Sequence, residues 1–217
     1  MPKISPRARR TLTEERRKQI LDAATRVFGA KGFERATIAD IAHAAGIAEG
    51  SIYNYFKNKG DLLVSIPRQA VQPTIESLGA QMASLQDQPP EQMLTSFALN
   101  MLATIQQNVH IFRILLSALP TMSAATRQKY LDQVVMYAIT TLESYFQEQI
   151  DRGIFQRHLV PSVLARSFIG MFITYIGLRD IAQLEKNATW TNDEIVGQVI
   201  PLFLRGALAD STKRKSK

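Results

Sequence analysis

The sequence predicts an all-α protein of about nine helices. Apolar residues recur at helical spacing along most of the 217 residues, and no alternating pattern reaches a useful strand length. Glycine and proline fall between the helical stretches, where they end one helix or begin the next. With 46% hydrophobic and 21% charged residues, the chain has enough apolar material for a sizeable core.

Composition excludes several classes of site. The chain has no cysteine, which excludes disulfides, thiolate zinc sites and cysteine nucleophiles. Its three histidines are far apart in sequence, so we expect no metal site, and we expect no cofactor. The longest apolar stretch, residues 163–178, is too short for a membrane span, and the basic N-terminus does not resemble a secretory signal. We therefore expect a cytoplasmic protein that does not enter a membrane.

Positive charge is concentrated near the N-terminus. Residues 1–60 hold 12 Lys and Arg against 6 Asp and Glu, whereas residues 61–210 hold 10 against 13. A basic N-terminal region followed by a mildly acidic remainder indicates binding to a polyanion, either nucleic acid or an anionic membrane. A solvated basic tail would give the same charge. We expect residues 1–12 and 211–217 to be a flexible basic arm and tail.

The first helix is predicted over residues 13–31, with Thr13 as its N-cap and Gly32 as its C-cap. Two short helices follow. Thr37 and Asp40 form a capping box, and Gly46 ends the first short helix in a left-handed conformation. The second short helix is predicted over residues 48–56. This pattern is typical of a helix-turn-helix, whose second helix lies in a DNA major groove, and an ordinary helical hairpin explains the pattern alone equally well.

The remaining helices follow from apolar periodicity between proline and glycine residues. Asn58 and Asp61 repeat the capping pattern and open a fourth helix, predicted over residues 58–86 with breaks at Pro67 and Pro73. The other helices are predicted at residues 90–107, 110–119, 123–151, 161–185 and 192–209.

Six short pieces of sequence occur in a fixed order near the N-terminus. They are residues 20–28 (ILDAATRVF), 31–33 (KGF), 37–42 (TIADIA), 45–47 (AGI), 50–56 (GSIYNYF) and 59–63 (KGDLL). In this order and spacing they resemble the DNA-binding domain of the tetracycline-repressor (TetR/AcrR) family of transcription regulators. The resemblance implies a three-helix helix-turn-helix domain over residues 13–60. It also implies a helical regulatory, ligand-binding and dimerisation domain over residues 61–210.

The resemblance assigns DNA contacts to the second and third helices and to the residues that follow them. Long basic and aromatic side chains position the protein on the DNA backbone, whereas short polar side chains read base edges. The implied backbone contacts are Thr37, Tyr53, Tyr55 and Lys59, with Tyr55 equally well interpreted as packed. The implied contacts to base edges or the nearby backbone are Gly50, Ser51 and Asn54.

Two further positions of this surface depart from what many members of the family carry. Ala39 stands where a longer basic side chain is frequent, and it suits contact with a thymine methyl group. Glu49 stands where lysine is frequent. It either accepts from a cytosine amine or interacts with the helix dipole, and we favour the dipole. These departures concern the operator sequence that the protein reads.

Residues 163–178 are apolar on almost every side of the predicted helix, so the helix must be covered from two directions. One side can meet the same chain, and the other requires a partner. In the resembled family the last two helices of each subunit form a four-helix-bundle dimer. We therefore expect a homodimer, with burial of both helices within one monomer as the alternative. The predicted interface residues are Ile169, Gly170, Ile173, Gly177, Val199 and Phe203.

A small-molecule site is expected among the middle helices, where aromatic and apolar residues converge with a few polar groups. The predicted ligand is a small, mostly apolar or aromatic molecule. The apolar positions also fit an ordinary helical core, which is the commoner interpretation of such a pattern. The candidate lining residues are Phe97, Asn100, Met101, Phe112, Leu116, Gln133, Tyr137 and Phe172.

Together these features predict a sequence-specific transcriptional regulator that binds a palindromic double-stranded operator as a homodimer. Repression that the ligand relieves is the expectation from the family, and the sequence does not distinguish it from activation. We expect no catalytic residues. The alternatives are a helical interaction protein without DNA binding and, last, an enzyme, for which the sequence carries no Gly-x-Ser-x-Gly, phosphate-binding glycine-rich or His-Glu-x-x-His motif.

Overall fold

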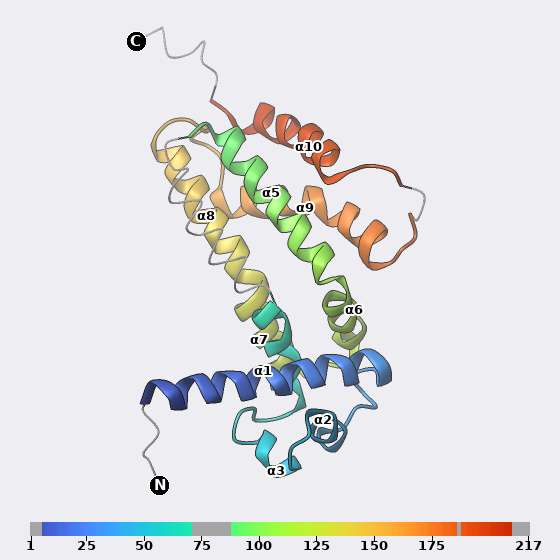
Figure 1. Ribbon diagram of the computed structural model, residues 1–217. Coiled ribbons are helices and arrows are strands. Elements are labelled where there is room, and N and C mark those ends of the chain that lie inside the picture. Colours follow the sequence, from blue (N-terminus) through green and yellow to red (C-terminus); the bar gives the residue numbers. More distant parts are fainter. Residues whose placement is uncertain (1–5, 71–87, 186–187, 210–217) are drawn as a thin grey trace, which may run out of the picture. The chain divides into compact units, whose positions relative to one another are not determined.

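The structure, a computed structural model, describes residues 6–70, 88–185 and 188–209 (Figure 1). Within these ranges the regular elements are helices, apart from one isolated antiparallel bridge between Phe155 and Leu208. The prediction of an all-α fold is confirmed. The chain divides into two compact units. The first comes from Met1–Gln72 and His110–Val134, and the second from Pro73–Val109 and Val135–Lys217.

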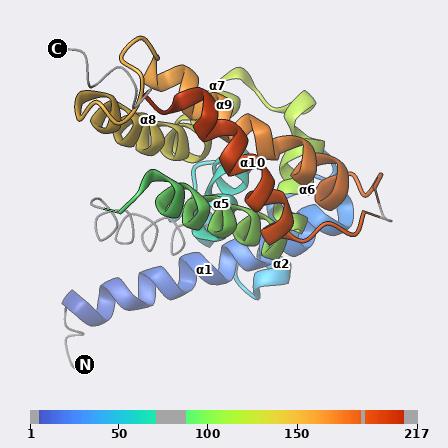
Figure 2. The ribbon, with the colours of Figure 1, turned by 90° about the horizontal axis from the view of Figure 1, so that it is seen from above.

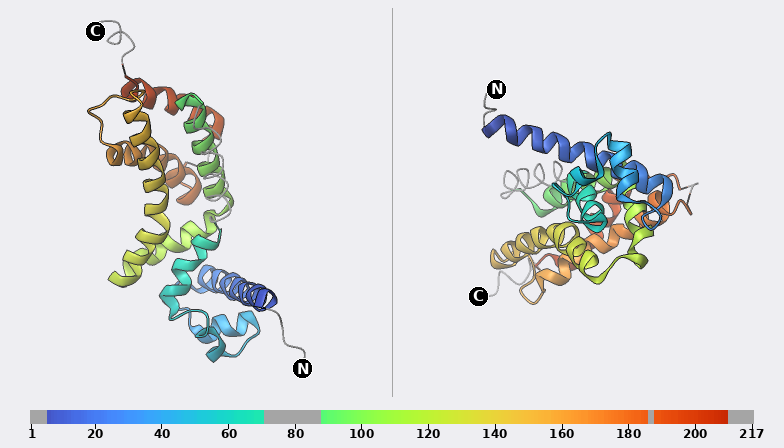
Figure 3. Two further views of the ribbon diagram at one scale, coloured as in Figure 1. Left: turned by 90° about the vertical axis from the view of Figure 1, so that its left-hand side faces the viewer. Right: turned by 90° about the horizontal axis from the view of Figure 1, so that it is seen from below.

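The first unit contains the predicted helix-turn-helix. Helix α1 lies against α2, and α2 lies against α3 (Figure 3). A helix over residues 59–70 follows, and α6 and α7 return to this unit from later in the chain. A 3₁₀ turn, η1 (Leu119–Thr121), joins these last two helices. The helices are α1 (Pro6–Lys31), α2 (Ile38–Ala45), α3 (Glu49–Ile52), α6 (Val109–Ala118) and α7 (Ala124–Tyr130).

A single apolar core joins these helices. Complete burial of each large apolar side chain stabilises the fold by about 1.5–3 kcal/mol. Because the helix over residues 59–70 and α6 share this core with α1–α3, the compact unit does not end at residue 60, where the sequence analysis placed the end of the DNA-binding domain. The buried core residues include Ile20, Phe28, Ile41, Ile52, Phe56, Leu62, Leu63, Ile111 and Leu115.

Helix α1 begins earlier than predicted. It starts at Pro6, so residues 6–12, expected to be part of a flexible arm, are helical, and Thr13 lies inside the helix rather than at its N-cap. A proline suits the first turn, where its missing N–H is not needed. One turn later Arg10 forms an i,i+4 ion pair with Glu14. The predicted tail, residues 211–217, and residues 1–5 of the arm lie outside the described residues.

Helix α7 lies against the start of the helix over residues 59–70. Lys129 of α7 forms an ion pair with Asp61, and a Cβ atom on Gly60 would lie only 2.6 Å from Thr126 Oγ1. Asn58 caps the same helix, because its Oδ1 accepts from the Asp61 amide at 2.9 Å, as predicted. The helix continues through Pro67 without a break. Pro73 lies outside the described residues.

The second unit is built from four longer helices and one π-helical segment. Helix α8 packs on α9, and α10 packs on α5 (Figure 2). The π-helical segment η2 (Leu131–Val135) interrupts the helix predicted at residues 123–151 without ending it. The π-helical segment of this unit, η3, forms the end of the helix predicted at residues 161–185, which stops at Ile181. The elements of this unit are α5 (Pro90–Gln107), α8 (Met136–Asp151), α9 (Pro161–Tyr175), η3 (Ile176–Ile181) and α10 (Asn192–Ala207).

Aromatic side chains fill the core of the second unit. Phe168 of α9 is fully buried, and its ring centroid lies 6.3 Å from that of Phe146 on α8 and 6.1 Å from that of Phe97 on α5. By length and composition alone, residues 161–181 would be apolar enough to cross a membrane. One side of this stretch, with Phe168 and Phe172, is buried among these rings, although only 28% of its apolar window is buried in the chain.

Candidate nucleic-acid interface

Reciprocal hydrogen bonds fix the start of α2. Thr37 Oγ1 accepts from the Asp40 amide at 3.1 Å, and Asp40 Oδ2 accepts from the Thr37 amide at 3.0 Å, which confirms the predicted capping box. Gly46 ends the helix with φ of 65°, as predicted. Lys31, at the end of α1, donates to Asp40 Oδ1 at 2.6 Å. The Lys31 ammonium, together with the Thr37 amide and hydroxyl, lowers the pKa of Asp40 to about 2.

Polar side chains of α1 hold the ends of the next two helices. Gln19 donates to the Ala45 carbonyl at 2.7 Å, at the end of α2. Arg17 donates to the Tyr55 carbonyl at 3.0 Å, in the turn after α3, and its guanidinium lies 4.2 Å from the Phe56 ring centroid. Neither role was predicted from the sequence. Both residues act inside the domain, so part of the positive charge of residues 1–60 is used for its internal structure.

Helix α3 presents one face to its own core and another outward. Ile52 and Phe56 are buried, at 0% and 1% exposure. Tyr53 is 55% exposed, and Asn54 is exposed beside it. Ser51 and Tyr55 are half-buried, and Tyr55 packs against the core of this unit. The exposed candidates on or next to α2 and α3 are Thr37, Ala39, Glu49, Gly50, Tyr53 and Asn54.

This outward face has the composition of a DNA-reading surface. The amide of Asn54 can donate to and accept from a base edge, and Gly50 allows a close approach of the backbone. Hydroxyls at Thr37 and Tyr53 suit phosphate oxygens. The caps of α2 and the contacts from α1 fix the backbone that carries these groups, so the surface is ordered before any DNA is bound.

Lys59 lies elsewhere than on this outward face. Its ammonium donates to the carbonyls of Phe33, Glu34 and Ala36 at 2.7, 3.0 and 3.0 Å, and lies 4.6 Å from the Phe33 ring centroid. The lysine therefore binds the loop between α1 and α2. This geometry does not support the phosphate contact that the resemblance implied.

The predicted effector residues do not gather in one unit. Phe97 and Phe172 are buried in the aromatic core of the second unit, where Asn100 and Met101 are half-buried on α5. Phe112, Leu116 and Gln133 belong to the first unit instead, with Leu116 48% exposed. The side chain of Tyr137 lies outside the described residues. Phe97 and Phe172 are therefore core residues, as the alternative interpretation held.

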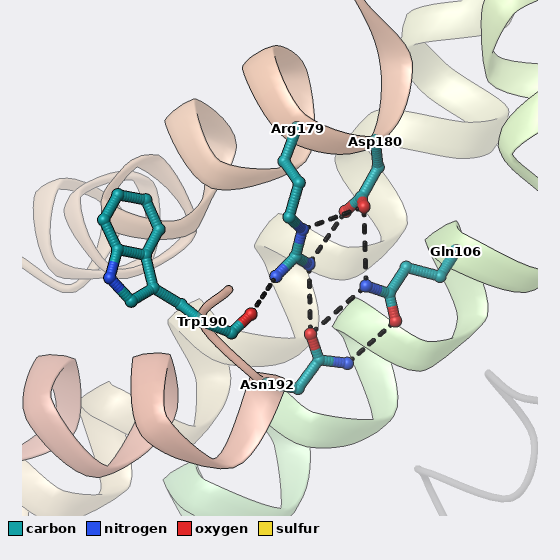
Figure 4. Close-up of polar contacts among 5 residues, drawn as sticks. All are labelled: Gln106, Arg179, Asp180, Trp190 and Asn192. Carbon is teal, nitrogen blue, oxygen red and sulfur yellow. Dashed lines mark hydrogen bonds and ion pairs between the residues drawn. The ribbon is translucent and has the colours of Figure 1, made fainter. Parts of the chain in front are cut away.

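A polar cluster that the sequence analysis missed lies in the second unit (Figure 4). Arg179, in η3, makes a two-fold ion pair with Asp180 and donates to the Trp190 carbonyl at 3.0 Å. Asn192, at the start of α10, donates to Gln106 Oε1 at 2.9 Å, and Gln106 Nε2 donates back to Asn192 Oδ1 at 3.3 Å. The cluster joins the end of α5 to η3 and α10. Within the described residues no three acidic or histidine side chains gather into a metal site.

The predicted dimer residues fall into two groups. On α9, Ile173 is 54% exposed and Gly170 is exposed, while Ile169 on α9 and Gly177 in η3 are partly buried. On α10, however, Val199 and Phe203 are 4% and 8% exposed and pack in the core of their own chain. In the single chain these two residues therefore face its own core rather than an outer surface. The exposed face of α10 carries Gly197, Gln198, Leu202, Arg205 and Gly206.

Comparison with known proteins supports the interpretation of the first unit. Residues 20–66 match the family model of bacterial regulatory proteins of the tetR family. Over 60 residues the chain is 42% identical to the fatty acid metabolism regulator protein of Bacillus subtilis, covering 28% of this chain and 31% of that protein. It is 47% identical over 60 residues to the HTH-type transcriptional regulator TtgR of Pseudomonas putida, covering 27% and 29%. The chain thus spans about three-tenths of the length of these curated relatives.

The fold of the whole chain also has solved counterparts. The transcriptional regulator FadR from Bacillus subtilis, solved in complex with stearoyl-CoA, superposes with a TM-score of 0.70 at 20% identity. The superposition covers 87% of this chain and 98% of FadR. At this identity the likeness concerns the fold alone. The match over residues 20–66 and the shared fold relate the chain to the TetR family of bacterial regulatory proteins.

Proposed function

We propose that the protein is a sequence-specific DNA-binding transcriptional regulator rather than an enzyme, and that it acts in the cytoplasm. The observation that carries the proposal is the outward face of α3 and its following turn. Tyr53 and Asn54 project from a backbone that the buried Ile52 and Phe56 anchor in the core. A helix-turn-helix places such residues in the major groove, where each base pair shows a distinct pattern of donors and acceptors.

Fluorescence anisotropy with labelled duplexes tests this proposal. A tiled set of duplexes from the DNA that flanks the gene is titrated with the full-length protein at fixed salt. A specific regulator binds one duplex about 10³-fold or more tightly than the others, as specific DNA-binding proteins do. Equal affinity for every duplex at every salt concentration would leave only a non-specific polyanion binder. Absence of binding by the folded protein would favour a helical interaction protein.

The proposed regulator is a homodimer on a palindromic operator. The two helix-turn-helix domains of one dimer reach successive major grooves when their recognition helices, α3 of each subunit, are about 34–36 Å apart. A partner subunit is supported by apolar side chains that the single chain leaves exposed on its last two long helices. They are Val163 and Ile173 on α9 and Leu202 on α10. These two helices meet inside the protomer through Phe168 and Phe203, so their outer residues belong to neighbouring helices. Repression of transcription is the regulatory sense that we propose.

The proposed effector is a small, mostly apolar or aromatic molecule that binds the second unit and causes the protein to release the DNA. A solved neighbour of the same fold, FadR, holds stearoyl-CoA, and the half-buried Met101 lies against the apolar core of the second unit. A ligand shifts the DNA-bound state only by its difference in affinity for the two states. At a hundredfold excess over Kd, it would stabilise the protein by about 2.7 kcal/mol.

Thermal unfolding in the presence of stearoyl-CoA, and separately of planar aromatic compounds, tests the effector. A stabilising compound is then added to the protein–DNA complex, where it should lower the anisotropy of the labelled duplex. Met101→Ala should weaken both effects, whereas Leu12→Ala, an exposed apolar residue on α1, is the matched control. Compounds that stabilise the protein but never displace the duplex would contradict the proposed release.

A further inference from the structure

Two lysines near the start of the helix over residues 59–70 have different surroundings. The ammonium of Lys59 has three N–H donors, and three backbone carbonyls between residues 33 and 36 accept at 2.7–3.0 Å. The side chain is half-buried. Lys57 is exposed, and within the described part of the chain its ammonium has neither a hydrogen-bond nor an ion-pair partner.

We propose that these lysines divide two tasks in DNA binding. Lys57 contacts a phosphate of the DNA backbone, and Lys59 is a positioning residue that holds the loop between α1 and α2. The proposal rests on the proposed DNA-binding function and specifies which lysine carries the electrostatic contact.

Moving Lys59 to a phosphate would break its contacts inside the domain. The bonds to the Phe33 and Ala36 carbonyls are partly buried, and a buried carbonyl that loses its partner destabilises the fold. The ammonium would also leave the face of the Phe33 ring, 4.6 Å from the ring centroid. These contacts therefore hold the Lys59 side chain in its position inside the domain more strongly than an ordinary surface lysine is held.

Lys57 has no such competing contacts, and its backbone is fixed. Its amide donates to Asp61 Oδ2 at 3.1 Å, and Asn58 beside it caps the following helix. The residue follows the exposed Tyr53 and Asn54 by a few positions, in the turn that leaves the recognition helix. A free cation on an ordered turn next to the base-reading residues is what a phosphate contact requires.

The position of Lys59 also explains how it would affect DNA binding without touching DNA. Ala36, whose carbonyl it binds, is buried and directly precedes Thr37, the N-cap of α2. Lys59 thus connects the start of the helix after α3 to the start of α2. Loss of these bonds would loosen Thr37 and Ala39, which lie on the proposed DNA surface.

The test compares Lys57→Gln with Lys59→Gln, since glutamine keeps N–H donors but removes the charge. Arg157→Gln, an exposed cation of the second unit, is the control for net charge. The affinity of each full-length variant for a mixed-sequence duplex is measured at several salt concentrations, and amide hydrogen exchange over residues 33–40 is measured without DNA. Because non-specific binding has the same phosphate contacts, no operator is needed.

We expect Lys57→Gln to lower the slope of log affinity against log salt by about 0.9 for each DNA-binding domain, which is the value for one phosphate contact. Amide hydrogen exchange over residues 33–40 should not change in this variant. We expect Lys59→Gln to keep the wild-type slope and to exchange faster over residues 33–40. A slope lowered by Lys59→Gln with unchanged exchange would overturn the assignment, as would a Lys57→Gln slope equal to that of the control. If the wild type shows no salt-dependent binding, the proposed function itself fails, and the exchange data alone decide the role of Lys59.

Discussion

Phe168 of α9 and Phe203 of α10 pack edge to face inside one protomer, with ring centroids 5.1 Å apart and an interplanar angle of 78°. Phe203 is therefore a core residue, and the surface available to a partner lies on the opposite side of the two helices. Leu202, its neighbour in sequence, is 60% exposed there. The two adjacent residues allow core packing and dimerisation to be separated by experiment.

The first prediction concerns assembly. Leu202→Asp combined with Ile173→Asp should give a folded monomer in sedimentation experiments, because each carboxylate would be buried without a partner only in a dimer. Phe203→Asp should instead unfold the protein, since truncating a buried phenylalanine alone costs about 3–5 kcal/mol. A stable dimer from the Leu202/Ile173 double variant would place the interface on another surface.

The second prediction concerns base reading. Asn54→Ala should change which duplex the protein prefers, with a loss of about 1–3 kcal/mol at one base pair and an unchanged salt slope. Asn58→Ala is the matched control, because Asn58 caps a helix. It should lower the stability by about 1 kcal/mol and leave the preferred sequence unchanged. Anisotropy titrations against a set of singly substituted duplexes measure both variants, and equal sequence preferences would remove Asn54 from the reading surface.

The third prediction concerns the contact between Gly60 and α7. A Cβ atom at residue 60 would lie 2.6 Å from Oγ1 and 3.1 Å from Cγ2 of Thr126. Gly60→Ala should therefore destabilise the protein by about 1 kcal/mol, despite the higher helix propensity of alanine. Combining it with Thr126→Ala should recover most of this loss. Chemical denaturation of the two single variants and the double variant gives the coupling energy, and additive effects would show that the contact adapts freely.

The fourth prediction concerns acid stability. The pKa of Asp40 is about 2 in the folded protein, against 3.8 for the free side chain. Between pH 2 and pH 3.8 the unfolded protein therefore binds a proton at Asp40 more readily than the folded protein does. The stabilising contribution of Asp40 is complete above about pH 4 and is lost as the pH falls through 2. Thermal unfolding of wild type and Asp40→Asn should differ at neutral pH and converge near pH 2. A difference that stays constant over this range would contradict the assigned contact with Lys31.

Local hydrogen bonds were the part of the fold that the sequence predicted well. Thr37, Asp40 and Gly46 act on backbone groups within a few residues, so their spacing alone specifies the capping box and the left-handed end of α2. The buried faces of the helices also follow from periodicity, as Ile52 and Phe56 show.

Contacts between distant residues and backbone carbonyls were not predictable in the same way. Arg17 binds the carbonyl of Tyr55, 38 residues away, and Lys59 binds that of Phe33, 26 residues away. Every residue has a carbonyl group, so the acceptor leaves no mark on the sequence. A basic residue that closes a loop therefore has the same sequence signature as one that meets DNA.

The predicted effector and dimer residues show a second point that apolar periodicity alone does not decide. An apolar stripe identifies the face of a helix that must be covered, but it does not identify what covers it. Val199 and Phe203 are covered by their own chain, and Phe97 and Phe172 pack with other rings rather than around an open site. The tertiary fold, which brings α5, α8, α9 and α10 together, decides between these uses.

A protection footprint on the DNA that flanks the gene reports binding and sequence preference together. We expect one protected stretch with two half-sites whose centres are about one helical turn, 10–10.5 base pairs, or a multiple of it apart. We also expect Asn54→Ala to weaken or move this protection while the protein stays folded. Uniform protection, or none, at concentrations where the wild-type protein is folded and dimeric would contradict the claim that this helix-turn-helix reads DNA sequence.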